Sequence, residues 1–407
     1  MRHKGEHMRQ TVRANKAECT GCGACVSICP KGAIAMRPDE EGFNYPVVDP
    51  ALCVSCDLCE KQCPVGKAHE EHTVHVFGAQ NKDTEIREKS SSGGVFTALA
   101  RQMIAGGGVV FGAAFDDALR VEHVGAIDEN ELAPMRGSKY VQSDAAEAIG
   151  NATALLARGI PVLFSGTPCQ VDGLLAKVKA KDRERLLTVD FVCHGVPSPG
   201  VFASYIAQIE KKHGQKVCAY TFRDKRLGWK DFSAVATLED GTQISGTQRD
   251  EPYLYGFLQN LYLRPSCGQC VNLRGKRHKS DITIADFWGS QEICPERDDD
   301  TGLSLVMVNT QKGREALRAA EKQLIVFAAD TEKMMRHNPS IEVPAVMHKK
   351  REAFFKFYKK NGFDSERVMK MLAGPSRAQQ IILRILHLPV GAARRVCRLL
   401  GIKGRKK

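Results

Sequence analysis

Residues 19–30 read CTGCGACVSICP and residues 53–64 read CVSCDLCEKQCP. Both stretches follow the pattern C-x2-C-x2-C-x3-C-P, and this repeat decides the fold of the first part of the chain. The close spacing lets one loop wrap a cuboidal iron–sulfur cluster while backbone N–H groups point at its sulfurs. Pro30 and Pro64 end the two wraps, because proline fixes φ and donates no backbone hydrogen bond. The repeat therefore predicts two [4Fe-4S] clusters, and paired clusters commonly pass single electrons.

The spacing is that of bacterial two-cluster ferredoxins, in which the fourth cysteine of each run ligates the other cluster. It predicts an α+β ferredoxin-type module at residues 16–72, preceded by a basic tail at residues 1–15. The predicted ligands are Cys19, Cys22, Cys25 and Cys63 for one cluster, and Cys53, Cys56, Cys59 and Cys29 for the other. Two four-cysteine zinc sites are the alternative, but zinc ribbons use separated C-x2-C pairs rather than such compact runs.

Composition places this module in a larger globular chain. Of its 407 residues, 43% are hydrophobic and 26% are charged, as in soluble proteins. No run of about 18 apolar residues occurs, so we expect no membrane span. The N-terminus lacks the apolar core of a secretory signal. Without such a signal, 15 cysteines favour metal sites over disulfides, and we expect a cytoplasmic protein.

The net charge of +12 is unevenly distributed along the chain. Residues 376–407 hold nine Lys or Arg and no Asp or Glu, so the remainder is nearly balanced. A nucleic-acid partner is not expected, because such proteins carry a basic face on the folded body. Residues 346–407 are predicted to be a helical, basic C-terminal extension. Its last part suits peripheral contact with an anionic membrane or an acidic partner, or forms a docking helix with a solvated tail.

A larger domain is expected at residues 75–345, where strand-like apolar runs alternate with helical patterns. Strands are predicted at 109–115, 161–166, 186–192, 281–287, 303–310 and 324–330, and helices at 95–105, 145–159, 170–180, 199–214 and 311–323. The helix after Ser90–Ser92 is expected to have a serine cap. A hairpin is predicted at 232–246, turning at Asp240 and Gly241. The alternation predicts an α/β domain with a mostly parallel or mixed sheet.

Three unusual motifs follow predicted strands of this domain: SGTPCQ (165–170), CHGVPSP (193–199) and DFWGS (286–290). Ligands of such sheets bind beyond the carboxyl ends of the strands, so these motifs predict a site. A further C-x2-C pair, Cys267 and Cys270, joins Cys169 and Cys193 in a second set of four thiols. The set suits a third [4Fe-4S] cluster or a zinc site, unless Cys169 and Cys193 are merely buried core residues. The ferredoxin module favours the third [4Fe-4S] cluster over zinc, because its electrons require a further redox centre as donor or acceptor.

Weaker signals indicate an anionic ligand at the same edge. The SSSGG stretch at 90–94 offers hydroxyls and N–H groups to a diphosphate, although an ordinary helix cap also explains it. The stretch RGSKYVQSD at 136–144 places Arg136 and Lys139 around a Gly-Ser turn, which suits an anion or forms a solvated loop. Trp288 either stacks on a ligand ring or fills the core. No G-x-G-x-x-G dinucleotide fingerprint occurs.

The order of the motifs KSSSGGVFTALA, VVFGAAFD, MRGSKYVQSD, VLFSGTPCQVDGL, VDFVCHGVPSP, FRDKRLGWKDF, LRPSCGQC and SDITIADFWG resembles the beta subunit of coenzyme F420 hydrogenase/dehydrogenase. The resemblance runs from about residue 75 to about residue 345. It implies an FAD-containing domain with a [4Fe-4S] cluster of its own. In that family the flavin exchanges a hydride with a two-electron partner, which is the deazaflavin coenzyme F420 in the archetypes and another substrate in other members.

The resemblance also implies roles for individual residues. Ser91, Ser92, Gly93 and Gly94 would contact the phosphates or ribose of FAD. The flavin would be lined by Arg136, Ser138, Lys139, Tyr140 and Gln142, with Thr167 and Pro168 beside it. Cys169, Cys193, Cys267 and Cys270 become ligands of the third cluster. No acid–base pair is evident, and His194 is either a proton donor or a structural residue.

The expected protein is an iron–sulfur flavoprotein oxidoreductase that links a two-electron donor or acceptor, through FAD, to one-electron clusters. Its expected partners are a redox protein or a small hydride donor or acceptor, F420 among them. One alternative is a non-catalytic electron-transfer or partner-binding subunit that uses only the ferredoxin clusters. A second is a basic iron–sulfur protein that binds nucleic acid through its tail.

Overall fold

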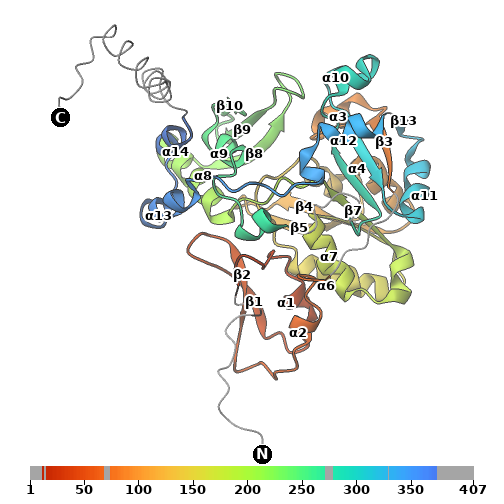
Figure 1. The fold of residues 1–407 in the computed structure, drawn as a ribbon, viewed down its shortest axis with the longest axis horizontal. Helices are drawn as coiled ribbons and strands as arrows, with labels where there is room; N and C mark the ends of the chain where they lie inside the picture. Colours follow the sequence, from red (N-terminus) through yellow and green to blue (C-terminus); the bar gives the residue numbers. More distant parts are fainter. Residues whose placement is uncertain (1–11, 13–14, 68–73, 271–277, 329, 374–407) are drawn as a thin grey trace, which may run out of the picture.

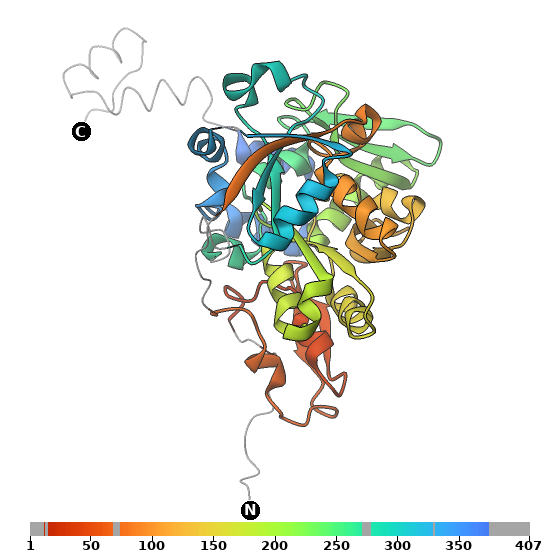
Figure 2. The ribbon, with the colours of Figure 1, turned by 90° about the vertical axis from the view of Figure 1, so that its right-hand side faces the viewer.

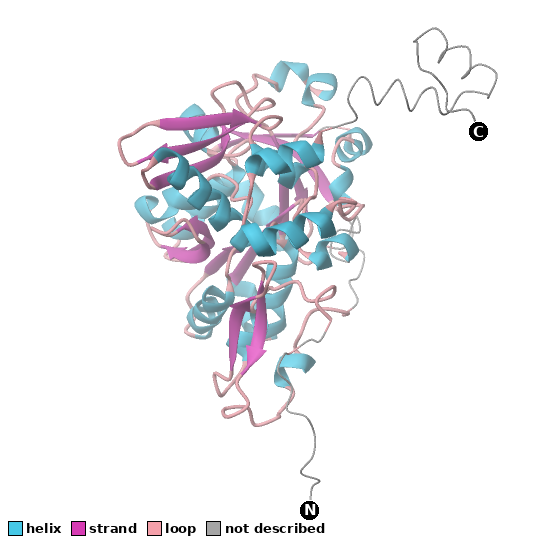
Figure 3. Ribbon diagram, turned by 90° about the vertical axis from the view of Figure 1, so that its left-hand side faces the viewer, coloured by secondary structure: helices cyan, strands magenta, loops and turns pink. Residues whose placement is uncertain are grey.

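The computed structural model describes residue 12 and residues 15–67, 74–270, 278–328 and 330–373. The ferredoxin-type module lies at one end of the molecule, below helices α6 and α7 in Figure 1. It contains β1 (Ile34–Pro38), β2 (Asn44–Val48), α1 (Ala24–Ile28) and α2 (Leu58–Lys61). Its two strands form an antiparallel hairpin, which stands apart from the other strands in Figure 3. The predicted α+β module is confirmed.

An eight-stranded mixed sheet forms the centre of the large domain. Its strands, in spatial order, are β13 (Leu324–Ala328), β3 (His75–Asn81), β12 (Ser304–Val308), β11 (Ile282–Asp286), β7 (Leu186–Phe191), β6 (Val162–Ser165), β4 (Val109–Phe115) and β5 (Val121–Ala126). Strands β11, β7, β6 and β4 run parallel. The pairings outside them are antiparallel. The expected α/β domain with a mostly parallel or mixed sheet is therefore confirmed as a mixed one.

Helices cover both faces of this sheet, because each carries one apolar stripe. One face packs against α4 (Val95–Ala105), α5 (Glu129–Leu132) and α11 (Gln311–Ala320). The other packs against α6 (Ala146–Ala157) and α7 (Pro168–Lys177), and α1 of the ferredoxin module lies against both helices. The module thus docks on the α6–α7 side, and Figure 2 shows it extending below the body of the molecule.

A second, smaller sheet lies beside the large one. Its antiparallel strands are β10 (Gln243–Thr247), β9 (Ser233–Leu238) and β8 (Val217–Asp224). The hairpin predicted at 232–246 is confirmed, and Gly241 takes the left-handed φ of 84° that its turn requires. An aromatic core joins this sheet to α8 (Pro199–His213), α9 (Pro252–Leu258), α13 (Arg351–Asn361) and α14 (Ser365–Leu372). The same core receives Phe43 and Tyr45 of the ferredoxin module.

Some elements were not predicted from the sequence. These are β3, β5 and β8 of the two sheets, and the helices α3 (Thr84–Lys89), α5, α9, α10 (Ser290–Ile293) and α12 (Thr331–Arg336). Helices α13 and α14 confirm the start of the predicted helical extension. The basic segment 376–407 and nearly all of the predicted N-terminal tail lie outside the described residues.

Candidate functional site

A cavity of about 440 Å³ opens beyond the carboxyl ends of the parallel strands. Strands β4, β6, β7 and β11 all contribute residues to its wall, as expected for ligand sites of such sheets. Small-molecule and cofactor sites usually have volumes of about 300–1,000 Å³. Most of the residues that the sequence associates with FAD line this cavity: Ser91, Ser92, Gly94, Arg136, Ser138, Lys139, Tyr140 and Thr167.

The serine loop, residues 90–94, is fixed on the sheet by short hydrogen bonds. Ser91 Oγ accepts from the backbone N of Ser138 at 2.5 Å, and Ser92 Oγ donates to a backbone carbonyl at 2.7 Å. Gly93 approaches β3 so closely that an added Cβ would lie 2.5 Å from a carbonyl oxygen of that strand. Gly94 caps α4 with a left-handed φ of 79° and no side-chain hydrogen bond. The predicted serine cap is therefore wrong, because glycine occupies the cap position.

Basic side chains lie across the cavity from this loop. Arg136 forms an ion pair with Glu129 and donates from Nε to Thr97 Oγ1 at 3.3 Å. Lys139 Nζ donates to the carbonyl oxygens of Pro134 and Arg136, at 2.6 and 2.8 Å. Burial lowers the pKa of Lys139 to about 7, and among the described residues Lys139 forms no ion pair. An anion beside a buried lysine raises its pKa again, so this wall suits an anionic ligand.

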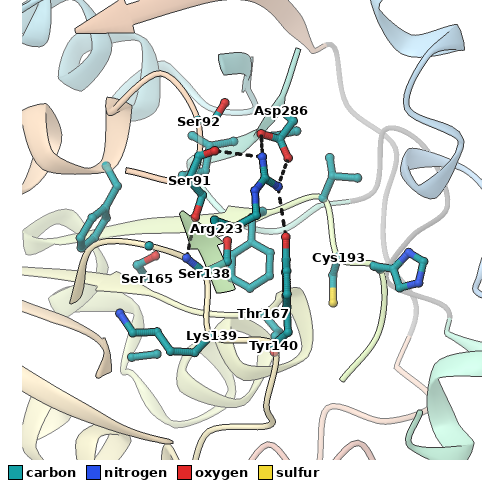
Figure 4. A pocket seen from close by; sticks show the side chains of 18 of the residues that line it. Ser91, Ser92, Ser138, Lys139, Tyr140, Ser165, Thr167, Cys193, Arg223 and Asp286 are labelled. Atoms are coloured by element: carbon teal, nitrogen blue, oxygen red, sulfur yellow. Dashed lines mark hydrogen bonds and ion pairs between the residues drawn. The ribbon is translucent and has the colours of Figure 1, made fainter. Parts of the chain in front are cut away.

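Arg223 lines the cavity and lies between Asp286, Ser91 and Tyr140, as Figure 4 shows. It donates to Asp286 Oδ2 and Oδ1 at 2.9 and 3.1 Å, and to Tyr140 Oη at 3.1 Å. A further bond runs to the carbonyl oxygen of Ser91 at 3.0 Å. Its guanidinium carbon lies 4.0 Å from the centre of the Phe232 ring. Arg223 thus ties the small sheet, through β8, to the serine loop and to the end of β11.

Sequence reasoning missed Arg223 and Asp286 as members of the site. Arg223 falls in FRDKRLGWKDF, one of the motifs that carry the family resemblance, and Asp286 is the first residue of DFWGS, one of the strand-end motifs that predicted a site. Trp288, left open between a ligand and a core role, lines the cavity and also stacks on Trp229 with ring centres 5.0 Å apart. Trp229 Nε1 donates to Asp286 Oδ1 at 2.9 Å, so the two indoles also support the carboxylate.

Two histidines in the cavity wall each keep one buried ring nitrogen without a partner. His123 shares a hydrogen bond with the Ser165 carbonyl through Nε2 at 2.9 Å, and Nδ1 is unpaired. Burial lowers the pKa of His123 to about 4, so this ring is neutral near pH 7. His194, the predicted proton donor or structural residue, packs edge-on against Phe257 and leaves Nε2 unpaired. Unpaired buried nitrogens are unfavourable unless a ligand or water bonds to them.

The thiols of the second cysteine quartet lie near enough to influence one another. Burial raises the pKa of Cys193, and the thiols of Cys267, Cys169 and Cys270 raise it further. Burial likewise raises the pKa of both Cys169 and Cys267 to about 11. The Cys270 thiol contributes to the raised pKa of Cys169, and the Cys169 thiol contributes to that of Cys267. Thiols that oppose one another's ionisation need a positive metal centre to become thiolates together.

Polar atoms surround this quartet. Thr167 Oγ1 lies 3.1 Å from Cys169 Sγ, and the backbone N of Val196 donates to Cys267 Sγ at 3.4 Å. Bonds of this type tune iron–sulfur clusters. In the part of the chain that the structure describes, no three His, Cys, Asp or Glu side chains are gathered as they would be around a single metal ion.

Two interactions between thiols of the ferredoxin module cross from one cysteine run to the other. Burial raises the pKa of Cys25 to about 12, and Cys19 and Cys63 are the strongest of the neighbouring thiols that raise it further. Burial raises the pKa of Cys59, and the Cys29 thiol raises it further. Cys63 of the second run thus lies near Cys25 of the first, and Cys29 of the first run lies near Cys59 of the second. Both proximities agree with the crossed pattern predicted for paired clusters.

The two cysteine systems meet where the module docks. Burial raises the pKa of Cys22, and Cys169 of the large domain is among the thiols that raise it further. A second cavity, of about 400 Å³, is lined by Pro64, Val65 and Gly66 of the module and by Cys169 and Cys270 of the quartet. Three of the residues that the sequence associates with FAD, Gly93, Gln142 and Pro168, lie outside the wall of the first cavity. Gln142 instead donates to the Thr20 carbonyl at 2.9 Å, and Pro168 is buried in the first turn of α7.

None of the helices described in residues 15–67, 74–270, 278–328 and 330–373 has the length and apolar character to span a bilayer. The fold and the cysteine arrangement define a class: an iron–sulfur electron-transfer protein of the oxidoreductase type, with a dicluster module docked on a mixed α/β domain.

Comparison with known families narrows this class. The family model for "Coenzyme F420 hydrogenase/dehydrogenase, beta subunit N-term" matches residues 76–150, and the model for the C terminus of the same subunit matches residues 161–333. A 4Fe-4S dicluster domain matches residues 18–67. The chain belongs to the family of coenzyme F420 hydrogenase/dehydrogenase beta subunits and carries an N-terminal dicluster ferredoxin domain, so the resemblance seen in the sequence is confirmed.

Individual relatives match parts of the chain. An uncharacterized ferredoxin of Methanocaldococcus jannaschii is 35% identical over 82 residues, which are 20% of this chain and all of that protein. One of the subunits of the F(420)H(2) dehydrogenase of Methanosarcina mazei is 23% identical over 188 residues, 43% of this chain and 53% of that relative. The chain therefore aligns with about half of that relative's length. A chain of the F420-reducing [NiFe] hydrogenase complex from Methanosarcina barkeri aligns with a TM-score of 0.45 and 19% identity, covering 67% of this chain and 90% of that one.

Proposed function

We propose that this chain is an iron–sulfur flavoprotein oxidoreductase that exchanges a hydride with coenzyme F420 or another two-electron partner and passes the electrons singly through three [4Fe-4S] clusters. One observation carries the proposal. Cys193 belongs both to the wall of the 440 Å³ cavity and to the second cysteine quartet. A cofactor in that cavity would therefore lie directly beside a cluster ligand, and the quartet in turn adjoins the ferredoxin module through Cys169 and Cys22.

The cavity has the chemistry that FAD requires. Ser91, Ser92 and Lys139 would hold the diphosphate or ribose, with charge and hydroxyl groups from two sides. Tyr140 and Trp288 offer aromatic surface for the rings, and the unpaired nitrogens of the buried histidines offer polar contacts. FAD, when bound, accepts a hydride as an electron pair and releases the electrons one at a time.

The chain itself supplies orientation, shielding from water and proton binding. Arg223, held by Asp286 and Tyr140, is fixed at the cavity wall, and its Nε has no partner within the described residues. A preorganised donor of this kind favours negative charge on a bound ligand. His194 is the group best placed to exchange a proton with a substrate, because Nε2 is unpaired and the ring lines the cavity next to Cys193.

The electron route would continue outward through the ferredoxin module. The quartet lies beside the cluster site of Cys19, Cys22, Cys25 and Cys63, and that site adjoins the one containing Cys59. The outer site includes Cys53 and Cys56, which are exposed. A cluster with exposed ligands is accessible to a one-electron redox protein, which we propose as the partner. We assign the two working units to residues 16–72 and 75–345, with 346–407 as an extension.

The test is to measure iron, acid-labile sulfide and flavin per chain in anaerobically purified protein. About 12 iron atoms and one FAD are expected for three four-iron clusters and one flavin. The loaded protein should then be reduced by F420H2, NADH, NADPH and reduced ferredoxin in turn to identify the hydride partner. About 8 iron atoms without flavin would refute the proposal and leave an electron carrier that uses only its ferredoxin clusters.

A further inference from the structure

Arg264 is buried between the two cysteine systems, and its side chain is fully inaccessible to solvent (0% exposed). It directly precedes the short 3-10 turn Pro265–Gln269, which carries Cys267. Its Nε donates to the Cys19 carbonyl oxygen at 2.8 Å, and Nη1 donates to Gln142 Oε1 at 2.8 Å and to the Asn44 carbonyl oxygen at 3.1 Å. Nη2 lies 3.8 Å from Cys19 Sγ. One side chain of the large domain thus contacts the first cysteine run of the ferredoxin module.

The same residue adjoins the quartet of the large domain. The backbone N of Cys267 donates to the Arg264 carbonyl oxygen at 3.0 Å, at the start of the turn that carries this cysteine. The planar face of the Arg264 guanidinium lies 4.1 Å from the centre of the Tyr45 ring, which shields it from water. Within the described residues Arg264 forms no salt bridge with a carboxylate. A buried cation without a carboxylate is unfavourable unless other negative charge lies close to it.

The first cysteine run is shaped to admit this side chain. Gly21, the third residue of the CTGC stretch, has a left-handed φ of 67°. A Cβ at Gly21 would lie 2.6 Å from Nη1 of Arg264 and 2.8 Å from Nε2 of Gln142. The loop around Cys19 and Cys22 therefore fits closely around the guanidinium of Arg264.

We infer that Arg264 is a positioning residue that raises the reduction potentials of both clusters beside it, the one bound by Cys19, Cys22, Cys25 and Cys63 and the one bound by Cys169, Cys193, Cys267 and Cys270. Reduction adds one electron to a cluster, and a fixed positive charge in a dry interior stabilises that electron. The outer cluster of Cys29, Cys53, Cys56 and Cys59 has no contact with Arg264 among the described residues. Arg264 therefore raises the reduction potentials of the two inner clusters and leaves that of the outer cluster unchanged.

This inference rests on the proposed clusters, and an EPR-monitored redox titration of the anaerobic full-length protein tests it. Arg264→Met removes the charge and keeps the length of the side chain. Gln142→Glu keeps Arg264 and places a carboxylate where Oε1 accepts from Nη1, which neutralises the charge locally. Arg264→Lys keeps the charge but loses the forked hydrogen bonds. Arg101→Met, on α4 and far from the module, is the control for removing one positive charge. Cys56→Ser and Cys193→Ser assign the signals of the outer cluster and the quartet.

Arg264→Met and Gln142→Glu should each move the two inner potentials to more negative values and leave the outer potential unchanged. Arg264→Lys should cause a smaller shift in the same direction, and Arg101→Met should cause none. If Arg264→Met loses iron, the reduction potentials measured in Gln142→Glu alone test the inference. Unchanged inner potentials, or an equal shift of all three, would refute the inference. About 8 iron atoms in the unmodified protein would instead show that the third cluster of the proposed function is absent. In that case the inference would still require a more negative reduction potential of the Cys19 cluster in Arg264→Met and Gln142→Glu.

Discussion

Arg223 donates two hydrogen bonds to Asp286, at 2.9 and 3.1 Å, and so joins a strand of the small sheet to a strand of the large one. Side chains from both sheets line the cavity, and this pair is the polar link between them. Arg223 is 3% exposed and Asp286 is 18% exposed. The pair is therefore a structural support as well as a feature of the candidate flavin site.

Asp286→Asn should destabilise the protein markedly, because it leaves the Arg223 charge buried without its carboxylate. Removing one partner of a buried pair lowers the free energy of unfolding by about 3 kcal/mol. Urea unfolding of the apoprotein measures this change. Glu366→Gln is the matched control, since it removes a carboxylate from an exposed pair with Lys370 and should cost under about 0.5 kcal/mol. Equal effects of the two substitutions would contradict the role of Asp286.

Flavin binding should become weaker as the pH rises above about 7, because of Lys139. Burial lowers the pKa of this lysine to about 7 in the protein without ligand. A bound diphosphate raises the pKa, so binding takes up a proton above pH 7 and the affinity falls by up to about tenfold per pH unit. Calorimetry of FAD binding in buffers of different ionisation enthalpy measures this uptake. Lys139→Met should remove most of it, and unchanged proton uptake in that variant would exclude Lys139 as the group responsible.

Lys139 also predicts a pH dependence of stability in the apoprotein. Its pKa is lower in the folded chain than in the unfolded chain, so between about pH 7 and the ordinary lysine pKa of about 10.4 the unfolded chain binds more protons. Stability from this group therefore increases as the pH rises through that window. Thermal unfolding at pH 7 and pH 9 should show the increase in the unmodified protein and a smaller one in Lys139→Met. An equal increase in both would contradict the assignment.

The elements that could be predicted from the sequence are those with a local signal. The cysteine runs define their own module through spacing. Strands β4, β6, β7 and β11 are rich in apolar residues, and distinctive motifs follow the last three. Strand β5 has no continuous apolar run, because the polar residues Glu122 and His123 interrupt it. Its exposed residues Val124 and Gly125 are consecutive, so the alternation typical of a half-buried strand is lost. The cap of α4 was mistaken because a left-handed glycine and an N-cap serine occur in the same SSSGG stretch, and only the backbone distinguishes them.

Residues whose partners lie on other strands or in the other module have no local signal in the sequence. Arg223 and Asp286 are single charged residues on different sheets, and their meeting depends on how the small sheet folds against the large one. Arg264 lies next to the LRPSCGQC cysteines in the sequence, yet its partners Cys19 and Asn44 belong to the other module. The position of Gln142 was mistaken for the same reason, because its side chain turns toward Thr20 instead of the cavity.

Cys169→Ala should remove one whole cluster and leave the ferredoxin clusters in place. Iron should fall from about 12 to about 8 atoms per chain, since a [4Fe-4S] cluster is held by four cysteines. Cys218→Ser is the control, because Cys218 is exposed and donates only to the carbonyl oxygens of Thr237 and Leu238. Iron that stays at about 12 in Cys169→Ala would exclude Cys169 as a ligand. One zinc atom lost in place of four iron atoms would identify the zinc site instead.

The C-terminal helix α13 should hold the ferredoxin module in place. Arg351 of this helix forms two bonds to Glu41 at the β1–β2 turn, at 2.5 and 3.3 Å, and its Nε donates to the Leu263 carbonyl oxygen at 2.9 Å. Arg351 and Glu41 are 16% and 22% exposed. Because the pair is partly buried, Arg351→Met should cost about 1–2 kcal/mol, between the values for surface and buried pairs.

The effect of Arg351→Met should be local and therefore visible by hydrogen exchange. Amides of the β1–β2 turn, residues 39–43, should exchange about tenfold faster, because local opening becomes easier by about that free energy. Lys359→Met provides the matched comparison, since Lys359 pairs with Glu40 in an exposed position and such pairs contribute little. Electron transfer from the quartet to the module should also slow in Arg351→Met alone. Turn amides that are equally protected in both variants would show that the aromatic core around Phe43, and not this ion pair, keeps the module docked.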